Sequence, residues 1–260
     1  VSTYGWSSVF YIFGATGFLW TAIWFFQARD NPADDPKVSQ EELALLQEHA
    51  HPDDEKEPIP WRKLFSSSAI WALFINHFCS NWVLYMLLAW LPSYFRGHLG
   101  LSITSAGIYS AAPWLTMLVA GNLAGWIADR MVTKGFSLTT VRKTMQTIGL
   151  VGSAIFLMLA RDVDTAGVAV LLMCGALGAV AFTWSGFVPN HLDIAPRYAD
   201  VLMGITNTAG TVPGIIGVAI TGWMVDVTGT YSAAFALAAA INIFGAIVWL
   251  GFATGERVID

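Results

Sequence analysis

Apolar residues in this chain occur in long uncharged stretches separated by short polar segments. An α-helix needs about 20 apolar residues to cross the roughly 30 Å hydrocarbon layer of a bilayer. A charge at mid-span costs roughly 2.5–3.5 kcal/mol on insertion scales, so uncharged stretches of this length indicate membrane embedding. The pattern therefore predicts an all-α transmembrane protein with seven spans: Trp6–Phe26, Ala69–Phe95, Thr104–Ala128, Thr144–Ala160, Ala166–Phe187, Val201–Val225 and Ser232–Ala253. The Thr144–Ala160 span is short, and we expect it to begin a few residues earlier.

Lys and Arg are distributed unequally between the two sides of these spans. If the segment after the first span is cytoplasmic, eleven basic residues face the cytoplasm and only Arg96 and Arg161 face the other side. This is a strong positive-inside bias. It predicts a cytoplasmic segment after the seventh span.

Composition agrees with membrane embedding and excludes several other classes. Charged residues make up 12% of the chain, about half of the roughly 25% found in soluble domains. The net charge of −5 arises in the segment 29–63, which holds ten acidic and five basic residues, so no basic face for nucleic acid is expected. Cys79 and Cys174 lie inside apolar runs, which predicts no disulfide framework.

The polar segment Gln27–Ser67 is the one clear linker, and Ser39 and Glu42 have the spacing of a capping box at the start of a short helix. It divides one leading span from six trailing ones. Because only five residues precede the first span and Val1 is not a methionine, we expect an upstream half to be missing. A seven-helix protein complete in itself is the alternative.

A weak internal repeat supports this division. An offset of 97 residues aligns Gly107-Ile108 with Gly204-Ile205, and Gly125-Trp126 and Asp129 with Gly222-Trp223 and Asp226. The two spans concerned run in opposite directions by the loop count. Inverted three-helix repeats of this kind are found within the halves of some transporters.

Polar side chains inside the spans are the candidates for solute binding. His77, Asn81 and Tyr85 are spaced four apart, and Ser80 lies on the same side of the helix. The stripe predicts either a solute-lining surface or hydrogen bonds between helices, since lipid would leave these groups unpaired. Further candidates are Thr183, Ser185, Thr206, Asn207 and Thr211. Asn207 has both donors and an acceptor to satisfy, either by a solute or by a neighbouring helix.

The polar segment 190–200 holds His191, Asp193, Arg197 and Asp200, and the part of the next span up to Gly217 contains four glycines and Pro213. We interpret the segment as a cytoplasmic hinge and the span as a closely packed helix. At the end of the third span, Gly125, Asp129 and Arg130 form a second polar motif. An acid at a helix C-terminus opposes the macrodipole, so Asp129 should be held by a cation or by the start of a neighbouring helix. Arg130, Arg142 and Lys143 are the available partners, in either a gating latch or an ordinary surface ion pair.

Signatures of enzymes are missing from the sequence. It contains no His-Glu-x-x-His, Gly-x-Ser-x-Gly or Gly-x-x-x-x-Gly-Lys, and no Cys and His at metal-ligand spacing. We therefore expect no catalytic residues, no cofactor and no metal site.

Several motifs resemble those of one transporter family. The run Asn190-His-Leu-Asp-Ile-Ala-Pro-Arg-Tyr-Ala and the following Gly204-Ile-Thr-Asn-Thr-Ala-Gly resemble the anion/cation symporters of the major facilitator superfamily, which include sialin, the vesicular glutamate transporters and sodium-phosphate cotransporters. Gly125–Arg130 is similar to the superfamily's Gly-x-x-Ala-Asp-Arg loop, and His77–Trp82 and Ala238–Glu256 are similar to sialin-type members. One position departs from a subgroup, because vesicular glutamate transporters have an arginine where this chain has Ser80.

The resemblance implies helices six to twelve of a twelve-helix carrier. Residues 1–26 would be the last helix of the N-terminal half, 27–67 the central cytoplasmic loop, 68–255 the C-terminal six-helix bundle and 256–260 a cytoplasmic tail. It implies alternating-access symport of a small organic or inorganic anion with H⁺ or Na⁺. From the polar positions within the spans, we expect the solute path to be lined by Ser80, Asn81, Tyr85, Ser185 and Asn207. The principal anion-binding arginine and the coupling acids would lie in the missing N-terminal half. The interpretation favours a plasma or inner membrane over an organelle membrane. A seven-helix receptor or assembly subunit without transport activity is the alternative.

Overall fold

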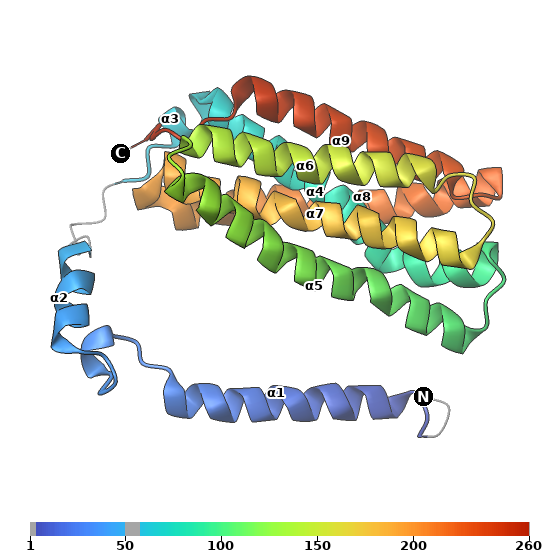
Figure 1. Ribbon diagram of the computed structural model, residues 1–260, viewed down its shortest axis with the longest axis horizontal. Helices are drawn as coiled ribbons and strands as arrows, with labels where there is room; N and C mark the ends of the chain where they lie inside the picture. Colours follow the sequence, from blue (N-terminus) through green and yellow to red (C-terminus); the bar gives the residue numbers. More distant parts are fainter. Residues whose placement is uncertain (1–3, 50–57, 260) are drawn as a thin grey trace. The chain divides into compact units, whose positions relative to one another are not determined.

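The computed structural model describes residues 4–49 and 58–259, and every regular element in these ranges is helical (Figure 1). The chain divides into two compact units, Val1–Pro58 and Ile59–Asp260. Residues 50–57 of the predicted loop and Asp260 of the predicted tail lie outside the described residues. The fold class expected from the apolar pattern is confirmed.

The first unit contains α1 (Ser7–Gln27), the 3-10 helix η1 (Pro32–Asp34) and α2 (Gln40–His49). None of the α1 residues is buried within the unit. A helix that is apolar on every side is suited to lipid or to neighbouring helices. The backbone N–H of Glu42 donates to Ser39 Oγ at 3.1 Å, which confirms the helix start predicted at Ser39.

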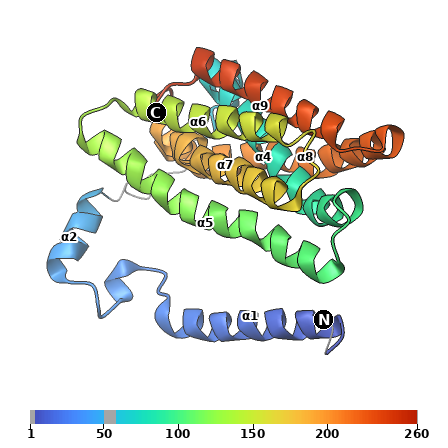
Figure 2. The same cartoon turned by 45° about the vertical axis from the view of Figure 1, so that its right-hand side comes forward.

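The second unit is a bundle of long helices (Figures 1 and 2). Its elements are α3 (Trp61–Ser66), α4 (Ser68–Ser93), the π-helical turn η2 (Tyr94–His98), α5 (Ile103–Thr133), α6 (Leu138–Leu159), α7 (Ala166–Ile194), the 3-10 helix η3 (Pro196–Tyr198), α8 (Ala199–Thr228) and α9 (Ser232–Phe252). Pro113 and Pro213 lie inside α5 and α8, and both helices continue through them.

Among the described residues, six of the seven predicted spans are long and apolar enough to cross a membrane: α1, Ser68–His98, α5, α7, Pro196–Thr228 and α9. The seventh, α6, has 22 residues but carries Arg142 and Lys143 in its second turn. These two charges lower its mean hydropathy. Its start at Leu138 confirms that this span begins before Thr144, and its packing along α7 and α9 places it within the bundle.

The packing of the bundle has an internal symmetry. α5 packs mainly on α7, and α8 packs mainly on α4. α6 and α9 pack on each other. In addition, α6 packs on α7, and α9 packs on α4. Exchanging the triplets α4–α5–α6 and α7–α8–α9 leaves this pattern unchanged. Figure 1 shows α5 and α8 running in opposite directions along the bundle. These observations are what the predicted three-helix repeat requires.

α4 lies inside the bundle and α5 and α8 lie at its periphery. In the most apolar window of each helix, 61% of residues are buried in the α4 span and 22% in both α5 and α8. The main apolar cluster joins side chains of α4, α7 and α9, including Met86, Leu177 and Phe235. The exposed faces of α5 and α8 are therefore available to further protein, lipid or water.

Candidate functional site

The polar stripe predicted on α4 is divided between two neighbours. Asn76 and Ser80 face α6, where Gln146 Nε2 donates to Asn76 Oδ1 at 3.0 Å and to Ser80 Oγ at 3.2 Å. Asn76 Nδ2 also donates to the carbonyl of Gly245 on α9 at 3.2 Å. All three polar side chains are 2% exposed or less. Ser80 therefore belongs to a buried network between helices, and a solute could reach it only if the helices separated.

The other side of the stripe faces α8. Asn81 Nδ2 donates to the carbonyl of Gly210 at 2.8 Å, and the Tyr85 ring packs against Gly214. The His77 ring lies on Gly210, where an added Cβ would come within 2.7 Å of Nε2. Glycine on α8 thus allows the backbone to approach the side chains of α4 closely, as predicted for this span.

Polar residues on α8 differ in how they are satisfied. Thr206 is buried and its hydroxyl lies 2.8 Å from Nε2 of His191 on α7. The exposed hydroxyls of Thr208 and Thr211 donate back to carbonyls of their own helix. Asn207 is exposed, and its amide has no hydrogen-bond partner among the described residues. An unpaired amide is costly in hydrocarbon, so this face of α8 should meet water or protein.

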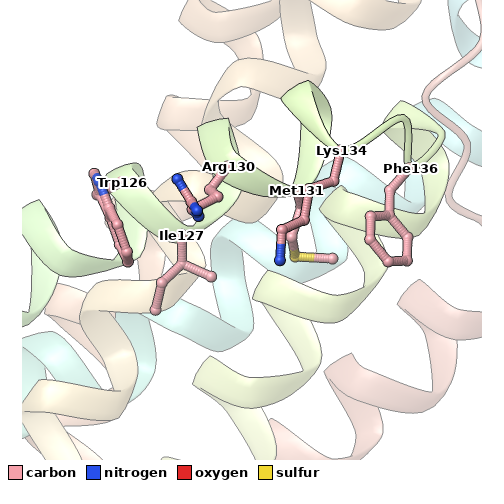
Figure 3. A pocket seen from close by; sticks show the side chains of 6 residues that line it. All are labelled: Trp126, Ile127, Arg130, Met131, Lys134 and Phe136. Atoms are coloured by element: carbon pink, nitrogen blue, oxygen red, sulfur yellow. The ribbon is translucent and has the colours of Figure 1, made fainter.

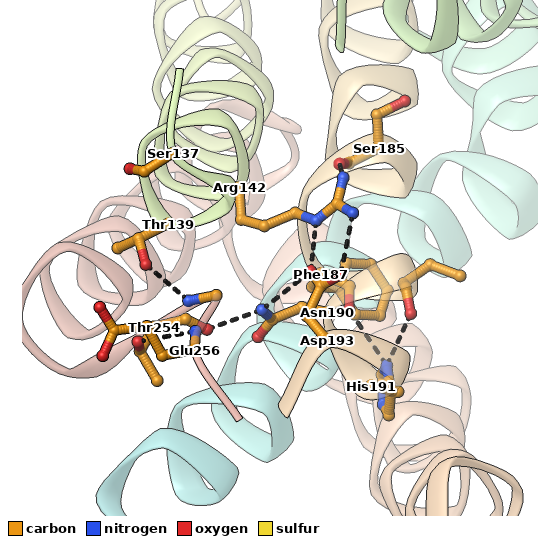
Figure 4. A network of polar contacts seen from close by, with 12 residues as sticks. Ser137, Thr139, Arg142, Ser185, Phe187, Asn190, His191, Asp193, Thr254 and Glu256 are labelled. Carbon is orange, nitrogen blue, oxygen red and sulfur yellow. Dashed lines mark hydrogen bonds and ion pairs between the residues drawn. The ribbon is translucent and has the colours of Figure 1, made fainter. Parts of the chain in front are cut away.

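Ser185 lies away from this face, at the α6–α7 contact. Its carbonyl accepts a hydrogen bond from Arg142 Nη1 at 3.2 Å, and the residue is half-buried (Figure 4). Thr183, two residues earlier, is buried and its hydroxyl donates to the Val180 carbonyl. Of the five predicted solute contacts, the structure places Asn81 and Asn207 on the facing helices α4 and α8, with Tyr85 beside Gly214. Ser80 and Ser185 lie elsewhere in the bundle.

Arg142 forms an ion pair that the sequence interpretation missed. Its Nε and Nη2 donate to the two carboxylate oxygens of Asp193 at 2.6 and 3.2 Å, and the side chains are only 12% and 11% exposed. Asp193 belongs to the last turn of α7. The macrodipole argument applied to Asp129 also applies to Asp193, but only once α7 is known to continue to Ile194, past the end of the predicted span at Phe187.

The partners predicted for Asp129 are wrong within this chain. Asp129 is exposed, Arg142 binds Asp193, and Lys143 Nζ donates to the Leu250 carbonyl at 2.8 Å. The Arg130 guanidinium lies over the Trp126 ring, 5.7 Å from its centroid.

Arg130 and Trp126 also line an open pocket at this end of α5, with Ile127, Met131, Lys134 and Phe136 (Figure 3). Gly125 has open space where a Cβ would stand, so it is not required for packing inside this bundle. Any partner of the exposed Asp129 carboxylate would therefore come from outside the described residues.

Comparison with known proteins identifies the family. The family model described as Major Facilitator Superfamily matches residues 1–218. The chain belongs to the major facilitator superfamily. This confirms the family predicted from its motifs, and members of this family are transporters, not enzymes.

Its relatives include plant and animal carriers. The chain is 43% identical over 260 residues to "Ascorbate transporter, chloroplastic" of Arabidopsis thaliana, covering all of this chain and 48% of the relative. It is 41% identical over 260 residues to "Sodium-dependent phosphate transport protein 1, chloroplastic" of the same species, covering all of this chain and 51% of the relative. It is 37% identical over 262 residues to "Vesicular glutamate transporter 2" of Homo sapiens, covering 97% of this chain and 45% of the relative. The chain therefore spans about half the length of the curated relatives it matches.

Proposed function

We propose that this chain forms the C-terminal part of a secondary transporter that moves a small anion by alternating access, together with H⁺ or Na⁺. The observation that carries the proposal is Asn207, an exposed amide without a partner among the described residues, in an apolar helix. Asn81 lies on the facing helix α4, bonded to Gly210 three residues further along α8. A polar solute between this face and the rest of the carrier would satisfy the Asn207 amide.

Anion recognition by this face would rely on neutral donors. None of the seven predicted spans contains Lys or Arg, and the Arg142 and Lys143 side chains before the fourth are engaged with Asp193 and the Leu250 carbonyl. The amides of Asn81 and Asn207 and the Tyr85 hydroxyl can orient an anion but cannot neutralise its charge. The neutralising cation would therefore come from the N-terminal half of the same polypeptide, which would also cover the exposed faces of α5 and α8.

The substrate class follows from the relatives and from Ser80. The relatives' names give ascorbate, phosphate and glutamate as their solutes. Ser80 stands where the resemblance places an arginine in vesicular glutamate transporters, and its hydroxyl is held by Gln146. We therefore favour phosphate or an organic acid other than glutamate as the solute. Because the relatives are chloroplastic or vesicular, we favour an organelle membrane over the plasma or inner membrane expected from the sequence.

The end of α5 would take part in gating. Asp129 and Arg130 are exposed at the predicted cytoplasmic end, next to Gly125, and form no ion pair with each other. In alternating access, the two halves of a carrier rock around a site near the bilayer midplane. Asp129 and Arg130 would then pair with residues of the other half in one of the two states. Ser185, at the α6–α7 contact, would reach the solute only through a similar rearrangement.

Replacing Asn207 with alanine is expected to weaken transport without preventing insertion. A hydrogen bond to a charged group contributes about 1.5–3 kcal/mol, so the KM for the anion should rise by roughly ten- to a hundredfold. The measurement is uptake of radiolabelled phosphate and ascorbate into proteoliposomes, by a full-length carrier that contains this chain.

Thr208→Ala is the matched control. Thr208 is the next residue and is also exposed, but its hydroxyl is satisfied by the Gly204 carbonyl. The KM of the Thr208→Ala carrier should stay close to that of the parent carrier. Equal uptake kinetics for Asn207→Ala and the parent would remove Asn207 from the site, and equal effects of the two variants would indicate a general disturbance of α8.

A further inference from the structure

The segment that follows α9 folds back onto the ends of α6 and α7. We call Ala253–Ile259 the return segment. The backbone N–H groups of Val258 and Ile259 both donate to the Ile194 carbonyl, at 2.8 and 3.0 Å. Ile194 is the last residue of α7, and its carbonyl has no acceptor role inside the helix. The return segment thus caps the end of α7.

A second contact joins the return segment to the side chain of Asn190. Asn190 Nδ2 donates to the Thr254 carbonyl at 2.7 Å, and it lies 3.4 Å from Asp193 Oδ2 (Figure 4). Asn190 is 1% exposed. Asn190 and Asp193 are therefore directed at the return segment and at Arg142, whereas His191 contacts Thr206 on α8.

The third contact is with the first turn of α6. The Gly255 N–H donates to Thr139 Oγ1 at 2.8 Å. A Cβ on Gly255 would lie 2.5 Å from the Thr139 nitrogen and 2.7 Å from the Leu138 carbonyl carbon. Both neighbours are backbone atoms that cannot rotate away. Only glycine permits this approach.

The return segment is buried at both of its ends and exposed at residues 256–258. Ala253 and Ile259 are 6% and 4% exposed and belong to an apolar cluster with Leu64, Tyr198 and Trp249, whereas Glu256 is exposed. Polar and apolar contacts together hold the segment.

We propose that Asn190–Ile194 and the first turn of α6 form a receptor for the return segment, and that its docking joins the ends of α6, α7 and α9 into one block. Lys143 and Trp249 reinforce this block, since Lys143 Nζ donates to the Leu250 carbonyl and Trp249 Nε1 donates to the Arg142 carbonyl. In this role the Asn-His-Leu-Asp-Ile run, which also indicates the family, holds a segment of its own chain. The proposal does not depend on transport.

Cysteine accessibility tests the docking. The detergent-solubilised chain carries either Ile259→Cys or Glu256→Cys and is treated with a small maleimide. The residue 259 thiol should react at least tenfold more slowly than the residue 256 thiol, because Ile259 is buried and Glu256 is exposed. Equal rates would overturn the proposal. Labelling of the chain without either substitution gives the background from Cys79 and Cys174.

Release of the segment is tested with two glycines of the same region. Adding Gly255→Ala to Ile259→Cys should raise the labelling rate at least fivefold, because the new Cβ meets the α6 backbone. Gly251→Ala is the matched control, since nothing lies within 4 Å of its Cβ position. Equal effects of Gly255→Ala and Gly251→Ala on the labelling rate would contradict the proposed docking of the return segment.

Cys79, which is 1% exposed on α4, reports whether release is local. It should stay protected while residue 259 becomes reactive. Simultaneous exposure of both thiols would show that the segment opens only with the whole bundle, which also contradicts a separate docking site.

Discussion

Arg142→Ala is expected to lower the free energy of unfolding by about 3 kcal/mol, since removing one partner of a buried ion pair leaves the other charge uncompensated. Arg142 contacts both carboxylate oxygens of Asp193, and both side chains are nearly nine-tenths buried. For a chain of this length such a loss corresponds to a Tm decrease of roughly 6–12 °C. The measurement is thermal unfolding of this chain in detergent. Asp193→Asn should have a similar effect.

Two controls distinguish the observed pair from the one expected on sequence grounds. Asp129→Asn changes an exposed acid and should alter Tm little, and Arg130→Ala removes an exposed cation that lies over Trp126. Exposed charges contribute about 0–1 kcal/mol. Arg142→Lys should fall between the parent and Arg142→Ala, because lysine keeps the charge but loses the two-point geometry. The stabilising role given to the Arg142–Asp193 ion pair is contradicted if Asp129→Asn destabilises the chain as much as Asp193→Asn.

Gly210→Ala is expected to have the second large effect, because the added methyl group has no space. It would stand 2.7 Å from His77 Nε2 and 2.9 Å from Cγ. The ring cannot move away freely, since Phe187 lies on it with a centroid distance of 4.8 Å. Overpacking of this kind costs about 1–3 kcal/mol. It would also push α8 away from α4 and lengthen the 2.8 Å bond from Asn81 to the Gly210 carbonyl.

The two readouts for this variant are Tm in detergent and uptake by a full-length carrier that contains this chain. Gly204→Ala is the matched control on the same helix, because nothing lies within 4 Å of its Cβ position. Combining Gly210→Ala with His77→Ala removes the ring that the methyl group meets and should recover part of the lost stability. No recovery in the double variant, or equal losses for Gly204→Ala and Gly210→Ala, would contradict the close α4–α8 contact.

The helices themselves could be predicted from the sequence. Long uncharged apolar stretches have few alternatives to membrane-spanning helices, because the backbone must satisfy its own hydrogen bonds in lipid. The span predicted at Ala166–Phe187 is part of α7, which continues to Ile194 through the polar motif. The extension was missed because Asn190, His191 and Asp193 read as a loop, whereas in the structure they are satisfied by Thr254, Thr206 and Arg142.

The candidate site could be predicted only in part. A spacing of four residues shows that His77, Asn81 and Tyr85 share one side of α4, but it does not show which helix that side meets. Ser80 was assigned to the same stripe, and the structure turns it toward Gln146 on α6. A helix side is about 100° wide or more, so residues on one predicted stripe can contact two different neighbours.

The all-helical membrane class, the approximate helix positions and the family follow from the sequence, since they depend on local hydrophobicity and on short motifs. The pairing of Arg142 with Asp193, the packing of His77 on Gly210 and the bond from Asn190 to the return segment depend on the packing of the helices. Each of these contacts joins residues at least 51 positions apart. The hydrophobic periodicity of a single helix does not encode such contacts, because the way the helices pack decides which neighbouring helix each side of a helix meets.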